Sequence, residues 1–181
     1  MAATMDFFRV SIRGVQIKGY HHFKVKAPSG TPFIVRKEAY NEYDPFALAC
    51  LIPAELELIP ELLRKMAIYS KSKRKSYTLE DVRGSQIGRI QYFLNRELSY
   101  LLECGKISRI EGIVNGEPTV SVRPNAAQKF QRNKQAGGGA YIPATIHVEG
   151  PREHKKAVLD RVCTSLAECE NGGLMTIDIE N

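Results

Sequence analysis

Tryptophan is absent from this sequence of 181 residues, and only four residues are cysteine. The cysteines are too scattered to form a CxxC pair or to match the ligand spacing of a zinc finger. We therefore expect free thiols, with disulfides as the alternative, and we predict neither a metal site nor a cofactor. The thiols concerned are Cys50, Cys104, Cys163 and Cys169.

Long apolar runs and catalytic motifs are also missing. No segment approaches the roughly 18 apolar residues of a membrane-spanning helix, and the first ten residues lack a basic segment followed by an apolar one. We expect an intracellular, nuclear protein without a membrane partner. GxSxG, HExxH and the phosphate-binding GxxxxGK[ST] loop do not occur. The sequence therefore predicts a protein that is not an enzyme.

Positive charge is in excess, with a formal net charge of +6, and it is unevenly distributed. From residue 150 onwards the chain carries six acidic and four basic side chains, so the excess lies in residues 1–149. A basic body of this kind favours a polyanionic partner. A solvated, lysine-rich surface is the alternative.

Short segments rich in β-branched and aromatic residues alternate with glycine and proline, which favours a mainly β fold, a small barrel or a sandwich. In the first fifty residues we expect strands at 6–13, 20–27, 31–38 and 46–52. Further strands are expected at 85–90, 140–150 and 173–180, and a hairpin around Asn115–Gly116. Because two helices are also expected, at 91–105 and from Pro151 to about 168, we predict a barrel of the α+β class with peripheral helices.

Residues 53–81 interrupt the run of strands. Apolar residues recur there every three to four positions up to residue 68, and a basic segment follows at 70–76. We interpret 53–81 as an insertion made of a short helix and a mobile basic loop. The loop could be a phosphate-binding arm, a solvated segment or a nuclear localisation signal. A second basic loop is expected at 123–139.

The bend between the strands 31–38 and 46–52 carries four side chains that can stack or hydrogen-bond: Tyr40, Asn41, Tyr43 and Asp44. Asp44 can accept hydrogen bonds from backbone N–H groups and so cap a turn. It can equally accept one from a ligand hydroxyl. The sequence leaves open whether this bend is only a capped turn or a ligand contact at the rim of a barrel.

Several segments resemble the HIRAN domain family. VRKEAYNEYDPFALAC at 35–50 is similar to the family's Arg followed by Asn-x-Tyr-Asp-x-x-Ala, and SQIGRIQYFLNRELSYLL at 85–102 to its glycine followed by a leucine-rich helix. IKGYHHF at 17–23 is similar to its glycine before an aromatic-rich strand, and 107–114 and 142–160 to its closing strands and helix. The resemblance extends over about residues 8–160.

The resemblance implies an OB-like barrel that binds single-stranded DNA and captures its 3′-terminal hydroxyl. It assigns acceptance of the hydroxyl to Asp44 and the flanking pocket to Asn41 and Tyr43. A carboxylate there can accept a hydrogen bond from an alcohol, whereas it would repel a phosphate.

This sequence departs from the family's pattern at five positions of the expected interface. His21 and His22 stand where the family has Arg and Tyr, and neutral histidine is the weaker phosphate ligand, although its ring can stack on a base. Arg89 stands where the family has His, and Tyr92 near a Lys position. Tyr141 lies beside the position of a base-stacking Phe.

We predict one HIRAN-like barrel domain over residues 1–160, on which the end of the last helix and the edge strand of 161–181 pack. The leading hypothesis is a module that binds single-stranded DNA and its 3′-hydroxyl end without catalysis. The alternative is a protein-interaction adaptor that has lost DNA binding and contacts its partner through 53–68. Phosphate contacts are expected from the basic loops, through Lys71, Lys73, Arg74, Lys75, Lys129, Arg132 and Lys134.

Overall fold

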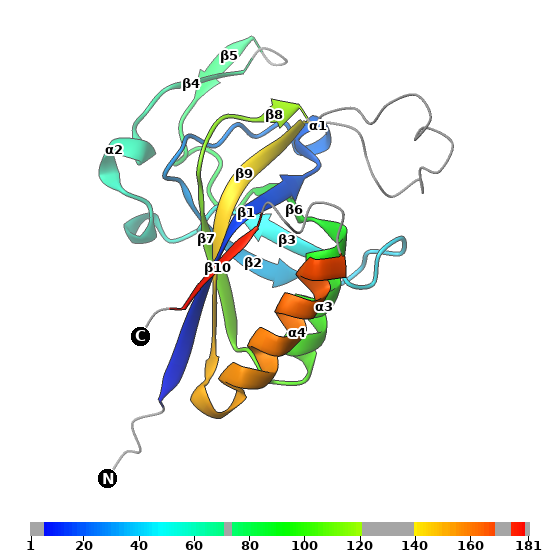
Figure 1. The fold of residues 1–181 in the computed structure, drawn as a ribbon. Coiled ribbons are helices and arrows are strands. Elements are labelled where there is room, and N and C mark those ends of the chain that lie inside the picture. Colours follow the sequence, from blue (N-terminus) through cyan, green and yellow to red (C-terminus); the bar gives the residue numbers. More distant parts are fainter. Residues whose placement is uncertain (1–5, 71–73, 121–139, 169–174, 180–181) are drawn as a thin grey trace.

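The computed structural model describes residues 6–70, 74–120, 140–168 and 175–179 (Figure 1). Six antiparallel strands form a closed barrel, because the first and last strands of the series pair with each other. In order around the barrel they are β1 (Phe7–Lys18), β6 (Gln86–Ile90), β3 (Leu48–Leu51), β2 (Pro32–Lys37), β7 (Arg109–Val114) and β9 (Ala140–Pro151). The predicted OB-like barrel with peripheral helices is therefore confirmed.

The long strand β9 shows how the sequence builds this barrel. Ile142, Ala144, Ile146 and Val148 alternate with more exposed residues and are buried in the core, as expected for a strand with one face inside. One edge of β9 pairs with β1 and the other with β7.

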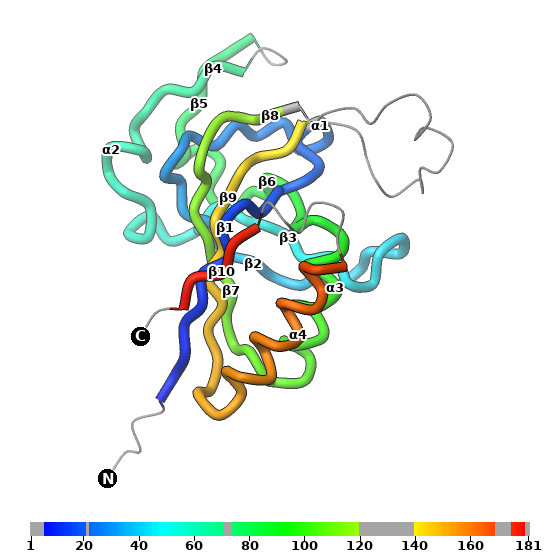
Figure 2. The backbone as a smooth tube through the Cα atoms, in the orientation of Figure 1, coloured from blue at the N-terminus to red at the C-terminus, as the bar shows by residue number. Residues whose placement is uncertain are grey.

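On its other edge, strand β1 pairs with two strands in turn. Its first half pairs with β10 (Thr176–Ile179), and its end pairs with β6. The register shifts between Ile12 and Val15, where Gly14 has φ 77°, and such a bulge bends a strand. The tube in Figure 2 follows this long, curved strand through the barrel. The edge strand predicted at 173–180 is thus present as β10.

Two helices lie beside each other against the lower part of the barrel in Figure 1. They are α3 (Tyr92–Glu103) and α4 (Lys155–Glu168), the latter preceded by the 3-10 turn η3 (Arg152–His154). Apolar side chains at helical spacing are buried from both, namely Leu94, Leu98, Leu101, Val158, Val162 and Leu166. Both helices match their predicted positions.

The segment 20–27 is not a strand. Tyr20–Phe23 forms a single helical turn, α1, and residues 24–28 are irregular. The residues on either side, Gly19 at φ 93° and Lys24 at φ 56°, have left-handed backbone conformations, which lie outside the extended region of a regular strand. The strand predicted at 20–27, which would contain His21 and His22, is therefore wrong.

The insertion contains less helix than predicted. It forms the 3-10 turn η1 (Leu56–Leu58), the short helix α2 (Glu61–Arg64), and a hairpin of β4 (Ile68–Ser70) and β5 (Lys75–Tyr77). The residue before a proline is disfavoured in helical conformation, and Ile59, before Pro60, is extended. Ile59, Ile68 and Leu79 are buried in the barrel's core cluster, so the insertion packs against the barrel.

The expected hairpin around Asn115–Gly116 is wrong as well. Strand β8 (Thr119–Val120) pairs with β9, on the same edge that β7 occupies further along. Asn115–Gly116 therefore lies at a bend along that edge. The backbone N–H of Asn115 donates to Pro143 of β9, and its side chain donates to Thr145.

Cys50 is buried in β3, whereas Cys104 and Cys163 are exposed, and all three are free thiols. Burial raises the pKa of the Cys50 thiol. Cys169 lies outside the described residues. In the part of the chain that the structure describes, no helix is both long enough and apolar enough to cross a bilayer.

Candidate nucleic-acid interface

The bend between β2 and β3 is a turn capped by its own side chains. Asn41 Oδ1 accepts hydrogen bonds from the backbone N–H groups of Tyr43 and Asp44, both at 3.0 Å. Asp44 Oδ1 accepts one from the N–H of Phe46 at 2.9 Å. These bonds satisfy backbone donors that have no sheet partner and give the exposed loop a fixed shape.

The other carboxylate oxygen of Asp44 faces α3. Asp44 Oδ2 accepts a hydrogen bond from Asn95 Nδ2 at 3.0 Å, and Asn95 is only 2% exposed. Asp44 itself is half-buried, so solvent still reaches it. Sequence reasoning missed Asn95, although an amide on the leucine-rich face of a helix is a recognisable signal that a polar partner packs there.

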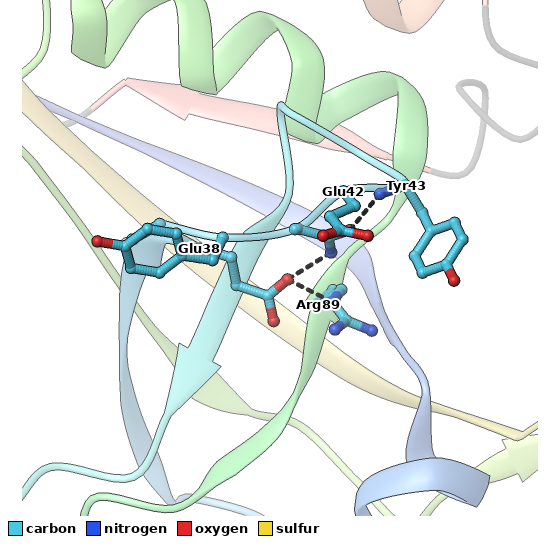
Figure 3. Close-up of a pocket in the computed structure, with 7 residues that line it drawn as sticks. Glu38, Glu42, Tyr43 and Arg89 are labelled. Carbon is cyan, nitrogen blue, oxygen red and sulfur yellow. Dashed lines mark hydrogen bonds and ion pairs between the residues drawn. The ribbon is translucent and has the colours of Figure 1, made fainter.

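Glu38, at the end of β2, connects this loop to the barrel wall. Its Oε2 accepts hydrogen bonds from Arg89 Nε at 2.9 Å and Asn41 Nδ2 at 2.6 Å, and its Oε1 accepts one from Gln86 Nε2 at 2.8 Å. Burial alone would raise the pKa of Glu38, but these three donors and the charge of Arg89 outweigh it and lower the pKa. Figure 3 shows the Glu38 carboxylate facing the Arg89 guanidinium.

A shallow depression of about 390 Å³ lies over this ion pair (Figure 3). The rings of Tyr40 and Tyr43, in the same loop, are 97% and 94% exposed. An aromatic ring that is almost wholly exposed makes few contacts with its own protein and is available for stacking. The depression is lined by Glu38, Ala39, Tyr40, Asn41, Glu42, Tyr43 and Arg89.

A row of basic side chains crosses the outer face of the barrel beside the depression. Arg36 of β2 pairs with Ala49 of β3, Ala49 pairs with Arg89 of β6, and Arg89 pairs with Lys18 of β1. Directly paired residues of neighbouring strands project from the same face of a sheet. Arg36, Arg89 and Lys18 therefore share one face, with a small residue between the first two. We call these three residues the basic row.

Two aromatic rings support the basic row. The guanidinium carbon of Arg89 lies 5.2 Å from the centroid of the Phe23 ring of α1, and Lys18 Nζ lies 5.1 Å from the centroid of Tyr141. Burial lowers the pKa of Lys18. These contacts keep both cationic groups against the barrel surface and limit their conformational freedom.

The structure brings some of the predicted site residues to this surface. Asn41, Tyr43 and Arg89 line the depression. Tyr141 contacts Lys18, at one end of the basic row. Asp44 lies in the same loop but turns its carboxylate towards α3.

The remaining aromatic and imidazole candidates lie on the helices α1 and α3. His22 is exposed on α1, and its ring stands edge-on to Phe23 with 5.0 Å between the centroids, so it adjoins Arg89 through that ring. His21 belongs to the same turn, but its side chain lies outside what the structure describes. Tyr92 is half-buried at the start of α3, with its ring 5.5 Å from that of Phe93.

The predicted basic loops contribute no described residue to the surface formed by the basic row and the depression. Arg74 and Lys75 lie in the β4–β5 hairpin, on the opposite side of the molecule from the β2–β3 loop in Figure 1. Sequence reasoning instead missed Arg36 and Lys18, which it could not assign to one face without the pairing of four strands. The other predicted contacts lie outside the described residues: Lys71, Lys73, Lys129, Arg132 and Lys134.

Comparison with known proteins gives a structural likeness only. No family model and no curated protein matches this sequence. The fold is similar to the crystal structure of the HIRAN domain of human HLTF, with a TM-score of 0.49 and 17% identity over 87% of this chain and 93% of that one. It is also similar to the NMR structure of the HLTF HIRAN domain, with a TM-score of 0.46 and 18% identity over 86% and 87% of the two chains.

Proposed function

We propose that this protein is a nucleic-acid-binding module that holds single-stranded DNA and its 3′-hydroxyl end without chemistry of its own. The observation that carries the proposal is the basic row, whose middle residue Arg89 lines the same depression as two almost fully exposed tyrosine rings. Cationic groups spaced across a barrel surface suit a phosphate backbone, and exposed rings suit unpaired bases. A duplex would leave its bases stacked inside and unable to reach the tyrosines.

The energetics of such an interface divide into two parts. Each stacked base contributes about 1–3 kcal/mol, and Tyr40 and Tyr43 offer two stacking surfaces. Each phosphate contact releases counterions, and for a single strand the slope of log affinity against log salt is about −0.7 per contact. Three contacts from the basic row predict a slope of about −2.

The acidic groups around the depression favour an uncharged terminus. Glu38 and Glu42 line the depression, and Asp44 lies beside it. A 3′-hydroxyl can donate a hydrogen bond to a carboxylate oxygen, since each oxygen has two lone pairs and the internal bonds of Asp44 use one of each. A 3′-phosphate would instead place two further negative charges among these carboxylates.

Fluorescence anisotropy with a labelled ten-nucleotide DNA strand tests the proposal. We expect salt-dependent binding of the 3′-hydroxyl form and weaker binding of the 3′-phosphate form and of duplex DNA. Asp44→Asn should reduce the difference between the two termini, because it removes one of the repelling charges. Arg89→Gln should weaken binding of both forms, whereas Arg152→Gln, at the opposite end of β9 from Tyr141, should leave binding unchanged.

Each part of the proposal can fail separately. Equal affinity for the two termini would exclude recognition of the hydroxyl end. Absence of salt-dependent binding to any single strand would exclude the nucleic-acid function altogether.

A second candidate function is protein binding through the insertion. Leu62 of α2 is 90% exposed, and Leu58 and Tyr69, at 50% and 59%, lie on neighbouring elements of the same insertion. Large exposed apolar side chains gathered in one segment are a feature of protein contacts. If this is the function, Leu62→Glu should abolish capture of a partner, Arg89→Gln should leave that capture unchanged, and the native protein should not bind single-stranded DNA.

A further inference from the structure

Arg89 is held in place by contacts that use only part of its guanidinium. Its Nε donates to Glu38, and the face of the group lies over Phe23. Among the described residues, neither terminal nitrogen of Arg89 donates a hydrogen bond. The two terminal N–H groups form the edge with which arginine binds two oxygens of one phosphate.

Glu38 is itself immobilised. Three donors, two from β6 and one from the β2–β3 loop, occupy its two oxygens, and its side chain is only 17% exposed. The hydrogen bonds from Arg89, Asn41 and Gln86 also lower its pKa, so the carboxylate is charged at neutral pH. A fixed, charged acceptor on the Nε side restricts where the rest of the Arg89 guanidinium can point.

We propose that Glu38 is a positioning residue for nucleic-acid binding. It fixes Arg89 so that both terminal nitrogens meet one phosphodiester of the bound strand. This inference rests on the proposed function. An arginine that is already oriented loses less side-chain entropy on binding than a free one, which offsets the repulsion that a carboxylate exerts on a nearby phosphate.

Replacing Glu38 therefore has two opposing effects. Removing its charge strengthens binding of any polyanion, whether or not Arg89 is present. Releasing Arg89 weakens binding, but only where Arg89 is present. The two effects are separated by measuring Glu38→Gln in the native protein and in an Arg89→Gln background.

Glu42 provides a matched control. It lines the same depression in the same loop, it is exposed, and among the described residues it makes no hydrogen bond or ion pair. Glu42→Gln removes the same charge without releasing Arg89. We expect it to strengthen binding slightly, and equally, in both backgrounds.

The experiment measures anisotropy of a ten-nucleotide single strand against the four combinations of Glu38→Gln and Arg89→Gln. We expect Glu38→Gln to weaken binding about tenfold in the native background, the equivalent of one charge-assisted hydrogen bond, and not to weaken it in the Arg89→Gln background. A strand with one neutral methylphosphonate linkage at the contacted phosphate should lose affinity for the native protein but not for Glu38→Gln. Circular dichroism establishes that each variant is folded.

Arg89→Lys keeps the test decisive if Glu38→Gln does not fold. Lysine keeps the charge but has no planar pair of donors, so we expect it to lose at least half of the free energy lost by Arg89→Gln. Full binding by Arg89→Lys, or an equal effect of Glu38→Gln in both backgrounds, would overturn the positioning role and leave the proposed function standing. Absence of binding by the native protein would overturn the proposed function itself.

Discussion

The bond between Asp44 and Asn95 joins the β2–β3 loop to helix α3, and its removal should measurably destabilise the fold. Asp44→Ala removes two hydrogen bonds, one to the N–H of Phe46 and one to Asn95 Nδ2. Asn95 is 2% exposed, and its Oδ1 already has no hydrogen-bond partner. After the substitution its whole amide would be buried without a partner.

The magnitude follows from these contacts. A buried amide left unpaired costs about 1–3 kcal/mol, and loss of the turn-capping bond adds about 1 kcal/mol. The free energy of unfolding should therefore fall by about 2–4 kcal/mol. For a protein of this size that lowers Tm by roughly 5–15 °C.

Asp44→Asn should be tolerated much better. The oxygen of the new amide still accepts from Phe46, and its NH₂ group can donate to Asn95 Oδ1 once the Asn95 amide turns over. One neutral hydrogen bond then replaces one charge-assisted bond, at a cost of about 1 kcal/mol.

Thermal and urea unfolding, followed by circular dichroism at neutral pH, measure these differences. If Asp44→Asn destabilises the protein as much as Asp44→Ala, the side-chain amide of Asn95 does not rotate to accept the new hydrogen bond. The carboxylate charge of Asp44 is then itself required. If Asp44→Ala costs less than about 1 kcal/mol, the bond to Asn95 does not stabilise the loop.

Three further predictions follow from the packing and the pKa shifts. A Cβ atom at Gly112 would lie 2.3 Å from Phe33 Cζ, so Gly112→Ala should lower the free energy of unfolding by at least about 2 kcal/mol, measured by urea titration. The thiol of Cys50 is fully buried and its pKa is raised, so mass spectrometry after alkylation of the native protein should find it unmodified while Cys104 and Cys163 have reacted; labelling of Cys50 equal to that of Cys104 and Cys163 would contradict the burial. Because hydrogen bonds lower the pKa of Glu38 below its ordinary value of 4.5, its contribution to stability is present above that pH and is lost as the pH falls through the folded-state pKa. Glu38→Gln should therefore flatten the fall of Tm below about pH 4.5, and an unchanged pH profile would show that the carboxylate is not linked to stability.

Local signals in the sequence were sufficient for several elements. Helix α3 could be predicted because Leu94, Leu98 and Leu101 recur at helical spacing before Gly105, which has φ 66°. The capped turn at Asn41 and Asp44 could be predicted as one alternative because Asx residues bond to backbone groups two and three positions away. Such interactions need only neighbouring residues.

Predictions failed where a local pattern competed with backbone geometry. Residues 20–27 have the composition of a strand, but the positive φ angles of Gly19 and Lys24 turn the chain into α1. Asn115–Gly116 is typical of a hairpin turn, yet the chain continues along β9 because that strand extends beyond β7 and offers an unpaired edge. Long-range pairing with β9 therefore decided which way the chain runs after Asn115–Gly116 and which strand β8 pairs with.

The sequence by itself determined the fold class, the two long helices and the hydrogen-bonding capacity of the β2–β3 loop, because these depend on side-chain periodicity and on contacts between near neighbours. Only the tertiary structure decided which cationic groups share a surface. Lys18, Arg36 and Arg89 are far apart in the sequence and meet on one face because four strands pair in one register. It also decided that Asp44 faces Asn95 and that Glu38 holds Arg89, since closure of the barrel and packing of α3 bring together groups that no local pattern relates.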